Sequence, residues 1–134
     1  MNSQTTSRVK RVLVADDDPT VLLLMESIVE QQGFGMVAAR DGREAYQILN
    51  GDADFIGAVF DMVMPYLDGP EMIHHMRTEK RLMQIPVVMM SAEQGPQLPA
   101  RGYKEGAIGF IPKSLDPART RVMLKVLMRP ASEN

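Results

Sequence analysis

The sequence predicts an α/β protein in which helices cover both faces of a parallel β-sheet. Five short apolar runs, most of them containing β-branched residues, have the length and character of buried strands. The segments between them carry apolar residues at helical spacing. Strands and helices that alternate along a chain of 134 residues are typical of one domain built on a parallel sheet.

The individual elements follow from local signals in chain order. Strands are predicted at residues 9–16, 35–39, 55–61, 85–90 and 107–111, and helices at 19–32, 41–49, 69–80 and from Asp116 to about Arg129. Asp18-Pro19 and Asp116-Pro117 favour helix starts, because aspartate caps a helix N-terminus and proline suits the first turn. The predicted inner face of the last helix consists of Val122, Val126 and Leu127.

One helix is expected to be irregular. The segment 92–106 should hold the fourth helix of the alternation, yet it contains Gly95, Pro96, Pro99 and Gly102. A proline inside a helix costs about 3 kcal/mol. We therefore expect this helix to be short, late-starting or distorted.

Composition narrows the function classes. The formal net charge is −2, which gives no basic surface for nucleic acid and no polybasic patch for a membrane. The absence of cysteine excludes disulfides, thiolate catalysis and cysteine-ligated zinc. The polar start MNSQTTSRVKR has no apolar core of a secretory signal, and no apolar run approaches the length of a membrane span, so a cytoplasmic protein is expected.

Acidic residues gather where two predicted strands end. Asp16 and Asp17 follow the first strand, and Asp61 ends the third. In doubly wound sheets, ligands bind beyond the carboxyl ends of the strands. Carboxylates that share one pocket repel each other unless a cation joins them, and oxygen ligands suit Mg²⁺. Asp18 is better explained as the helix cap.

Two further side chains are expected at the same edge of the sheet. Ser91 ends the fourth strand and Lys113 follows the fifth. A lysine ammonium and a hydroxyl can each bind a phosphoryl oxygen, and phosphoryl transfer depends chiefly on positioning and charge. Taken singly, each residue would more often have a plain structural role, so the prediction depends on their convergence with the acidic residues.

These motifs resemble the response-regulator receiver family of two-component signalling over nearly the whole chain. The resemblance is carried by VLVADDDP (residues 12–19), FDMVMPYLDG (60–69), VVMMSAE (87–93) and GAIGFIPKS (106–114). It implies a flavodoxin-like (βα)5 fold with strand order 2-1-3-4-5. It also implies a receiver domain at residues 9–130, between a disordered tail at 1–8 and a short tail at 131–134.

The resemblance implies a role for each site residue. Asp61 would accept a phosphoryl group from a sensor histidine kinase or a histidine phosphotransfer protein. Asp16 and Asp17 would hold Mg²⁺ together with Asp61 and the backbone carbonyl of Val63. The chain would then be a single-domain receiver, a signalling protein and not an enzyme, that neither binds nucleic acid nor enters a membrane.

The same resemblance implies how the signal would be transmitted. Lys113 would pair with the phosphoryl group, Ser91 would move to hydrogen-bond it, and Phe110 would turn inward as the aromatic switch. The fourth helix, the fifth strand and the fifth helix would form the face that binds a downstream protein.

One residue departs from the family pattern, and two others are notable for their position. Ser114 stands where the family usually has proline, so a trans peptide bond after Lys113 is expected. Pro112 inside a strand is tolerable only at the edge of a sheet. Val63, two residues after the acceptor, cannot hold an attacking water through its side chain, which predicts slow loss of the phosphoryl group.

Two other functions stay open at this stage. A receiver-like interaction module that is never phosphorylated would fit Ser114 and the irregular fourth helix. A small aspartyl-phosphate phosphatase would share the chemistry, but such enzymes carry a second acid at the position of Val63. The neighbouring His74 and His75 are expected on the surface of the third helix. Most of the methionines on strands and inner helix faces are expected in the core, namely Met62, Met64, Met72, Met76, Met89 and Met90.

Overall fold

The computed structural model describes residues 9–91, 97–113 and 116–127. Its strands are β1 Arg11–Ala15, β2 Gly35–Ala39, β3 Gly57–Asp61, β4 Val87–Ser91 and β5 Gly109–Pro112. Its helices are α1 Pro19–Gln31, α2 Gly42–Gly51, α3 Gly69–Arg77, α4 Gln97–Glu105 and α5 Pro117–Leu127. The predicted elements are thus all present, with ends displaced by one to three residues in most cases. The predicted tails at 1–8 and 131–134 lie outside the described residues.

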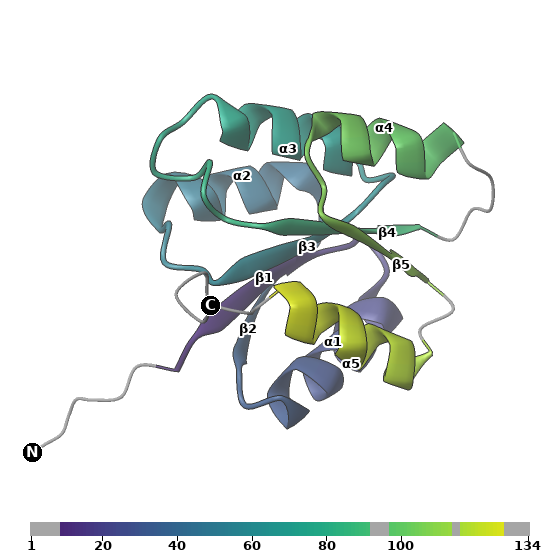
Figure 1. Ribbon diagram of the computed structural model, residues 1–134. Helices are drawn as coiled ribbons and strands as arrows, with labels where there is room; N and C mark the ends of the chain where they lie inside the picture. The colour runs from purple at the N-terminus through teal and green to yellow at the C-terminus, as the bar shows by residue number, and fades with distance from the viewer. Residues whose placement is uncertain (1–8, 92–96, 114–115, 128–134) are drawn as a thin grey trace, which may run out of the picture.

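The five strands form one parallel sheet in the order β2-β1-β3-β4-β5, which confirms the doubly wound fold. Helices α2, α3 and α4 cover one face, and α1 and α5 cover the other (Figure 1). The order reverses direction at β1 and β3, so these two strands are adjacent at the centre. That reversal creates the crevice in which doubly wound domains bind their ligands.

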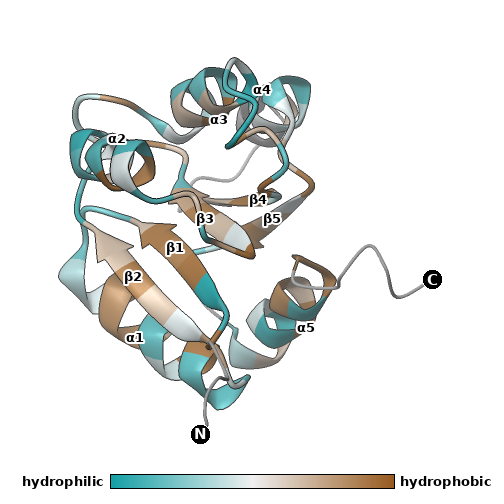
Figure 2. Ribbon diagram, turned by 90° about the vertical axis from the view of Figure 1, so that its left-hand side faces the viewer, coloured by the Kyte–Doolittle hydropathy of each residue, from teal (hydrophilic) through white to brown (hydrophobic). Residues whose placement is uncertain are grey.

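Alternating residues of each strand feed two separate apolar cores. On β1, Leu13 and Ala15 face the α2–α3 side, whereas Val12 and Val14 face α1 and α5. All four side chains are fully buried, so β1 is covered on both faces. Figure 2 shows the apolar colouring of the strands and the banded colouring of the helices that pack on them. The six methionines predicted for the core are all buried, which confirms that prediction.

Helix α4 has the late start that the sequence predicted. It spans nine residues, and Pro99 is the third of them. In the first turn of a helix the backbone N–H has no intrahelical partner, so a proline there removes no hydrogen bond. Gly102 lets the helix approach the sheet closely, because a Cβ atom there would lie 3.1 Å from the Met89 side chain. The residues 92–96 before the helix lie outside the described part.

Strand β5 is an edge strand, which explains how it can contain Pro112. Among the described residues its only sheet neighbour is β4, and Pro112 pairs in register with Ser91. The backbone N–H of the next residue, Lys113, donates to the Ser91 carbonyl at 2.9 Å. The tolerance predicted for proline at a sheet edge is confirmed, whereas the Lys113–Ser114 bond lies outside the described residues.

The predicted inner face of α5 was wrong at two of three positions. Val122 and Val126 are 62% and 52% exposed, and only Leu127 is buried. The buried face consists of Thr120, Leu124 and Leu127, which recur at the spacing of one helix face. A threonine in this stripe shifted the apparent apolar pattern.

His75 on α3 was also misplaced. It is half-buried, with its ring 4.4 Å from that of Tyr46, whereas His74 is exposed as expected.

Replacing Thr120 with valine is expected to stabilise the fold. Thr120 is fully buried, and its hydroxyl has no hydrogen-bond partner among the described residues. An unsatisfied buried hydroxyl costs about 1–3 kcal/mol, and valine has nearly the same shape, so we expect a gain of about 1 kcal/mol in chemical denaturation. The control is Thr78→Val, which removes a hydroxyl that donates to the His75 carbonyl at 2.7 Å and should give no gain. A less stable Thr120→Val variant would show that the hydroxyl is satisfied.

Candidate functional site

The site is built on two carboxylates from adjacent strands. Asp16 follows the last residue of β1, and Asp61 is the last residue of β3. Ala15 pairs in register with Phe60, so the two aspartates lie level at the carboxyl end of the sheet. Asp16 is fully buried and Asp61 is 4% exposed. The strand-end argument from the sequence therefore located them correctly.

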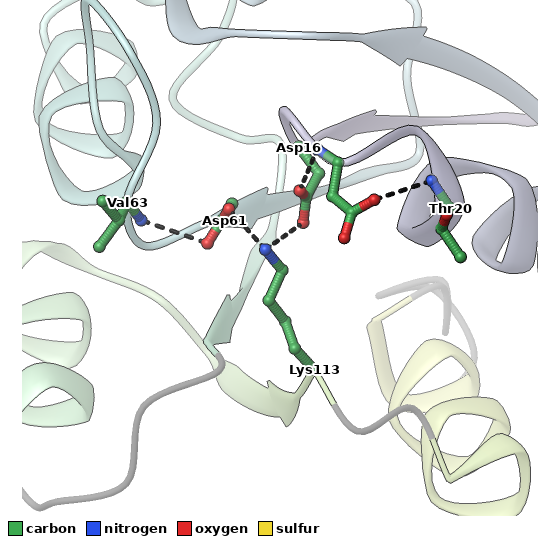
Figure 3. Close-up of polar contacts among 6 residues, drawn as sticks. Asp16, Thr20, Asp61, Val63 and Lys113 are labelled. Atoms are coloured by element: carbon green, nitrogen blue, oxygen red, sulfur yellow. Dashed lines mark hydrogen bonds and ion pairs between the residues drawn. The ribbon is translucent and has the colours of Figure 1, made fainter.

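Lys113 joins the two carboxylates. Its Nζ lies 2.9 Å from Asp61 Oδ2 and 3.1 Å from Asp16 Oδ2 (Figure 3). Lys113 follows β5, and β4 lies between β5 and β3, so its side chain spans the end of β4 to reach both acids. This bridge brings together residues from the beginning, the middle and the end of the chain.

Burial dominates the electrostatics of Asp16. Desolvation raises the pKa of Asp16 to about 6, and the nearby charge of Asp61 raises it as well. The backbone N–H of Asp18, which donates to Asp16 Oδ1 at 2.9 Å, and the Lys113 ammonium act in the opposite direction. Burial lowers the pKa of Lys113, but the two carboxylates together raise it by more. The lysine therefore stays charged near neutral pH, and the Asp16 carboxyl is poised to gain or lose a proton.

Three carboxylates are placed to hold a cation. Asp16, Asp17 and Asp61 each offer an oxygen within 4.8 Å of those of the other two. Asp17 is exposed, so the cluster opens to solvent on its side. Asp16 Oδ2 is buried and makes no regular hydrogen bond within the described residues, its contact being the ion pair with Lys113. An all-oxygen set, in which one buried oxygen has the Lys113 ammonium as its contact, fits a hard divalent ion such as Mg²⁺.

The segment after Asp61 contributes through its backbone. The N–H of Val63 donates to Asp61 Oδ1 at 3.2 Å (Figure 3), and Val63 is 60% exposed. Asp61 Oδ1 and Oδ2 are thus held by different groups, Val63 and Lys113. These two contacts restrict the rotation of the Asp61 carboxylate.

Ser91 and Phe110 lie where the sequence predicted. Ser91 is the last residue of β4, one position beyond the register partner of Asp61, and it is 4% exposed. Phe110 on β5 is half-buried and packs against the core on the α3–α4 side. Ser91 therefore lies beside β3, the strand that ends at Asp61, and Phe110 lies beside the helix layer that covers this face of the sheet. Their movement on phosphorylation stays a prediction.

The sequence did not predict an ion pair between α4 and the loop of residues 62–68 that follows Asp61, which we call the site loop. Asp68 caps α3 through a capping box with Glu71, and its second oxygen lies 3.0 Å from the Arg101 guanidinium on α4. The capping pattern Asp-x-x-Glu was readable at 68–71. The ion pair with Arg101 was not, because it joins two elements far apart in the sequence.

The sheet order and the acidic site at the carboxyl ends of its strands define a flavodoxin-like domain with a carboxylate cluster that could hold a cation. A sequence model of the response regulator receiver domain matches residues 12–125, so the chain belongs to the response regulator receiver domain family. Domains of this family are signalling modules.

Similarity to individual proteins supports the same assignment. The chain is 32% identical over 124 residues to the phosphate regulon transcriptional regulatory protein PhoB of Escherichia coli, covering 92% of this chain and 53% of that protein. It is 29% identical over 124 residues to the response regulator GtcR of Aneurinibacillus migulanus, covering 92% and 50%. The chain thus spans about half the length of the curated relatives it matches.

Solved structures show the same fold. The chemotaxis protein CheY4 of Vibrio cholerae superposes with a TM-score of 0.82 at 24% identity, covering 90% of this chain and 99% of that one. A chain of the CheX-CheY-BeF3-Mg complex of Borrelia burgdorferi superposes with a TM-score of 0.80 at 26% identity, covering 90% of both chains.

Within the described residues, none of the helices combines the length and apolar character that a membrane crossing requires.

Proposed function

We propose that this receiver domain is a phosphorylation-controlled switch and that Asp61 is its phosphoacceptor. The observation that carries the proposal is the contact of Lys113 with both Asp61 and Asp16 beside a three-carboxylate cation site. Lys113 and the Val63 N–H hold the two oxygens of Asp61. Asp16 is held in a similar way, by Lys113 and the Asp18 N–H. It is fully buried, however, whereas Asp61 is 4% exposed. The Asp61 carboxylate is therefore oriented for attack on an incoming group.

The chemistry is a transfer of a phosphoryl group from a phosphohistidine of a histidine kinase or a histidine phosphotransfer protein. An Asp61 oxygen forms a bond to phosphorus as the bond from phosphorus to the histidine nitrogen breaks. The electron pair of the broken bond stays on that nitrogen, and the imidazole, protonated at its other ring nitrogen, leaves in the neutral form. Mg²⁺, when bound, would neutralise charge on the phosphoryl oxygens. The residues proposed to hold it are Asp16, Asp17 and Asp61, with the backbone carbonyl of Val63.

The switch follows from a change of charge at Asp61. Phosphorylation adds about 1.5 to 2 negative charges and three acceptor oxygens. Lys113 would pair with this group and Ser91 would hydrogen-bond it, so both would favour the conformation that brings them closest. Phe110 would then move inward from its half-buried position.

The face formed by α4, β5 and α5 is the proposed docking surface for a downstream protein. Four apolar side chains on these elements, or directly before β5, are at least half exposed to solvent. They are Tyr103, Ile108, Val122 and Val126. A partner that covers them would bury apolar area that the domain alone leaves in water. The domain would thus act by protein docking and would not turn over a substrate.

Beryllofluoride, which mimics a phosphoryl group on a carboxylate, tests the proposal directly. With Mg²⁺ present it should raise the thermal unfolding midpoint, because a ligand at about 100 times its Kd adds about 2.7 kcal/mol of stability. Asp61→Asn should abolish the rise. Asp18→Asn is the matched control, since asparagine also caps a helix and Asp18 lies outside the cluster, and it should respond like the wild type. A wild-type midpoint that beryllofluoride and Mg²⁺ leave unchanged would refute the proposed function.

Replacing Val63 with asparagine should shorten the lifetime of the phosphorylated domain. Val63 is exposed beside Asp61 and offers no polar side chain, whereas an asparagine amide could orient a water for attack on phosphorus. We expect a half-life shorter by on the order of tenfold, since orienting the attacking water is a recurrent part of this chemistry. Loss of ³²P from the purified phosphoprotein measures it, with Val63→Leu as the apolar control. A half-life equal to or longer than that of the wild type would contradict this role.

A further inference from the structure

Tyr66 has a strained backbone in the loop that follows the phosphoacceptor. Its φ is +73°, the one positive φ of a non-glycine residue in the described part of the chain. The N–H of Leu67 donates to the Pro65 carbonyl at 2.9 Å, so Tyr66 is the central residue of a three-residue turn. With a positive φ at its centre, this turn is of the rare and strained kind, and a bulky residue there is an outlier.

The start of α2 holds this turn in place. The Pro65 carbonyl also accepts a hydrogen bond from the N–H of Gly42 at 3.2 Å. A Cβ atom on Gly42 would collide with Leu67, so only glycine lets the loop approach so closely. The guanidinium of Arg43 lies over the Tyr66 ring, 4.2 Å from its centroid. Backbone strain persists only where the surroundings fix it in this way.

Burial of the Tyr66 side chain does not offset the strain of its backbone. The Tyr66 side chain is 65% exposed and belongs to neither apolar core. Little burial therefore offsets the cost of the backbone, and asparagine or glycine would adopt the same φ more easily. Strained residues of this kind concentrate at functional sites.

The Tyr66 ring belongs to a loop that a phosphodonor protein would meet. Asp61 is 4% exposed, so a protein that delivers a phosphoryl group must cover the rim of the site to reach it. The loop from Met62 to Asp68 follows Asp61 directly and contacts its carboxylate through the Val63 N–H, so it forms part of that rim. It presents two exposed large apolar side chains, Val63 at 60% and Tyr66 at 65%. A phosphodonor is the partner that must come within bonding distance of Asp61, so it is the partner that meets this loop.

We propose that Tyr66 is an anchor for the phosphodonor protein and that it packs against apolar side chains flanking the donor's phosphohistidine. The inference rests on the proposed function and adds to it the chemistry of the donor surface. Aromatic side chains held rigidly at an interface commonly carry much of its affinity. Arg43 would keep the ring in place before the donor arrives.

The test compares a protein donor with a small one. Tyr66→Asn keeps a residue that tolerates positive φ and removes the ring. Phosphorylation by phosphoramidate, which needs no docking, should stay within about twofold of the wild-type rate. The protein donor is the autophosphorylated histidine kinase of the same genome that phosphorylates the wild type fastest. With it, kcat/KM should fall about tenfold, as expected for the loss of one interface anchor.

Two further variants sharpen the result. Tyr66→Phe keeps the ring and should transfer nearly as fast as the wild type from either donor. Met83→Asn removes an exposed apolar side chain from the segment between α3 and β4, away from the site loop, and should change neither rate. Selective loss in Tyr66→Asn alone supports the anchor.

Different experimental results would contradict the role of Tyr66 as an anchor and the proposed function of the domain. If Tyr66→Asn slows both donors equally, the residue shapes the site itself and the anchor is overturned. It is also overturned if neither rate changes, or if the wild type accepts phosphoryl groups from phosphoramidate but from no histidine kinase of that genome. A wild type that phosphoramidate cannot phosphorylate would instead overturn the proposed function, and the anchor with it.

Discussion

Replacing Lys113 with methionine is expected to lower the free energy of unfolding by about 3 kcal/mol at pH 7, measured by urea denaturation. Lys113 contacts Asp16 and Asp61, and the three side chains are 16%, 0% and 5% exposed. Without the ammonium, two buried carboxylates would face each other with no positive charge between them, and one would take up a proton. The loss should shrink at pH 5, where protonation of Asp16 already removes one of the charges.

The control for this variant is Lys125→Met, which removes an exposed lysine of α5. Its effect should stay within about 0.5 kcal/mol. Mg²⁺ should restore more stability to Lys113→Met than it adds to the wild type, because a divalent ion in the cluster supplies the missing positive charge. If Lys113→Met is as stable as the wild type at pH 7 without Mg²⁺, the two carboxylates do not depend on this lysine.

The affinity for Mg²⁺ is expected to fall about tenfold for each pH unit below pH 6, because one proton competes with the ion. Burial raises the pKa of Asp16 from 3.8 to about 6. Between these two values the folded chain holds a proton that the unfolded chain releases. Without metal, this carboxyl therefore contributes stability below pH 4 that is lost as the pH rises through 6. Mg²⁺ binding has the opposite dependence, since it requires the ionised form.

Isothermal titration calorimetry between pH 5 and pH 8 measures this dependence. Asp16→Asn should bind Mg²⁺ more weakly at pH 7 and should lose the tenfold slope below pH 6. Asp18→Asn, which leaves the three-carboxylate cluster intact, should keep the slope. An affinity in the wild type that is flat from pH 5 to pH 7 would show that Asp16 does not ligate the ion or is not buried as described.

The fold was predictable from the sequence because strands buried on both faces leave continuous apolar runs. Such runs identified β1 and β4 to within two residues. The inner face of α5 was not predictable in the same way, because its buried stripe includes Thr120 while two valines face outward. Helical phase is ambiguous when the buried side of a helix is partly polar and its exposed side partly apolar.

The sequence predicted which residues meet in the candidate site, but it did not predict how they contact one another. The rule that ligands bind at the carboxyl ends of strands selected Asp16, Asp61 and Lys113 from a chain with many charged residues. The contact of one ammonium with both acids could not be foreseen, because it depends on a lysine side chain spanning β4. Neither the Arg101–Asp68 ion pair nor the turn at Tyr66 has a sequence signature.

Pro112, the last residue of β5, affects how the domain can associate with other chains. The Lys113 N–H points toward β4, so the nitrogen of the preceding Pro112 lies on the opposite, outer side of the strand. That nitrogen carries no hydrogen, so an arriving chain finds a donor missing where it would try to extend the sheet. Extension of the sheet from one copy of this domain to the next, the first step toward a fibril, is thereby disfavoured.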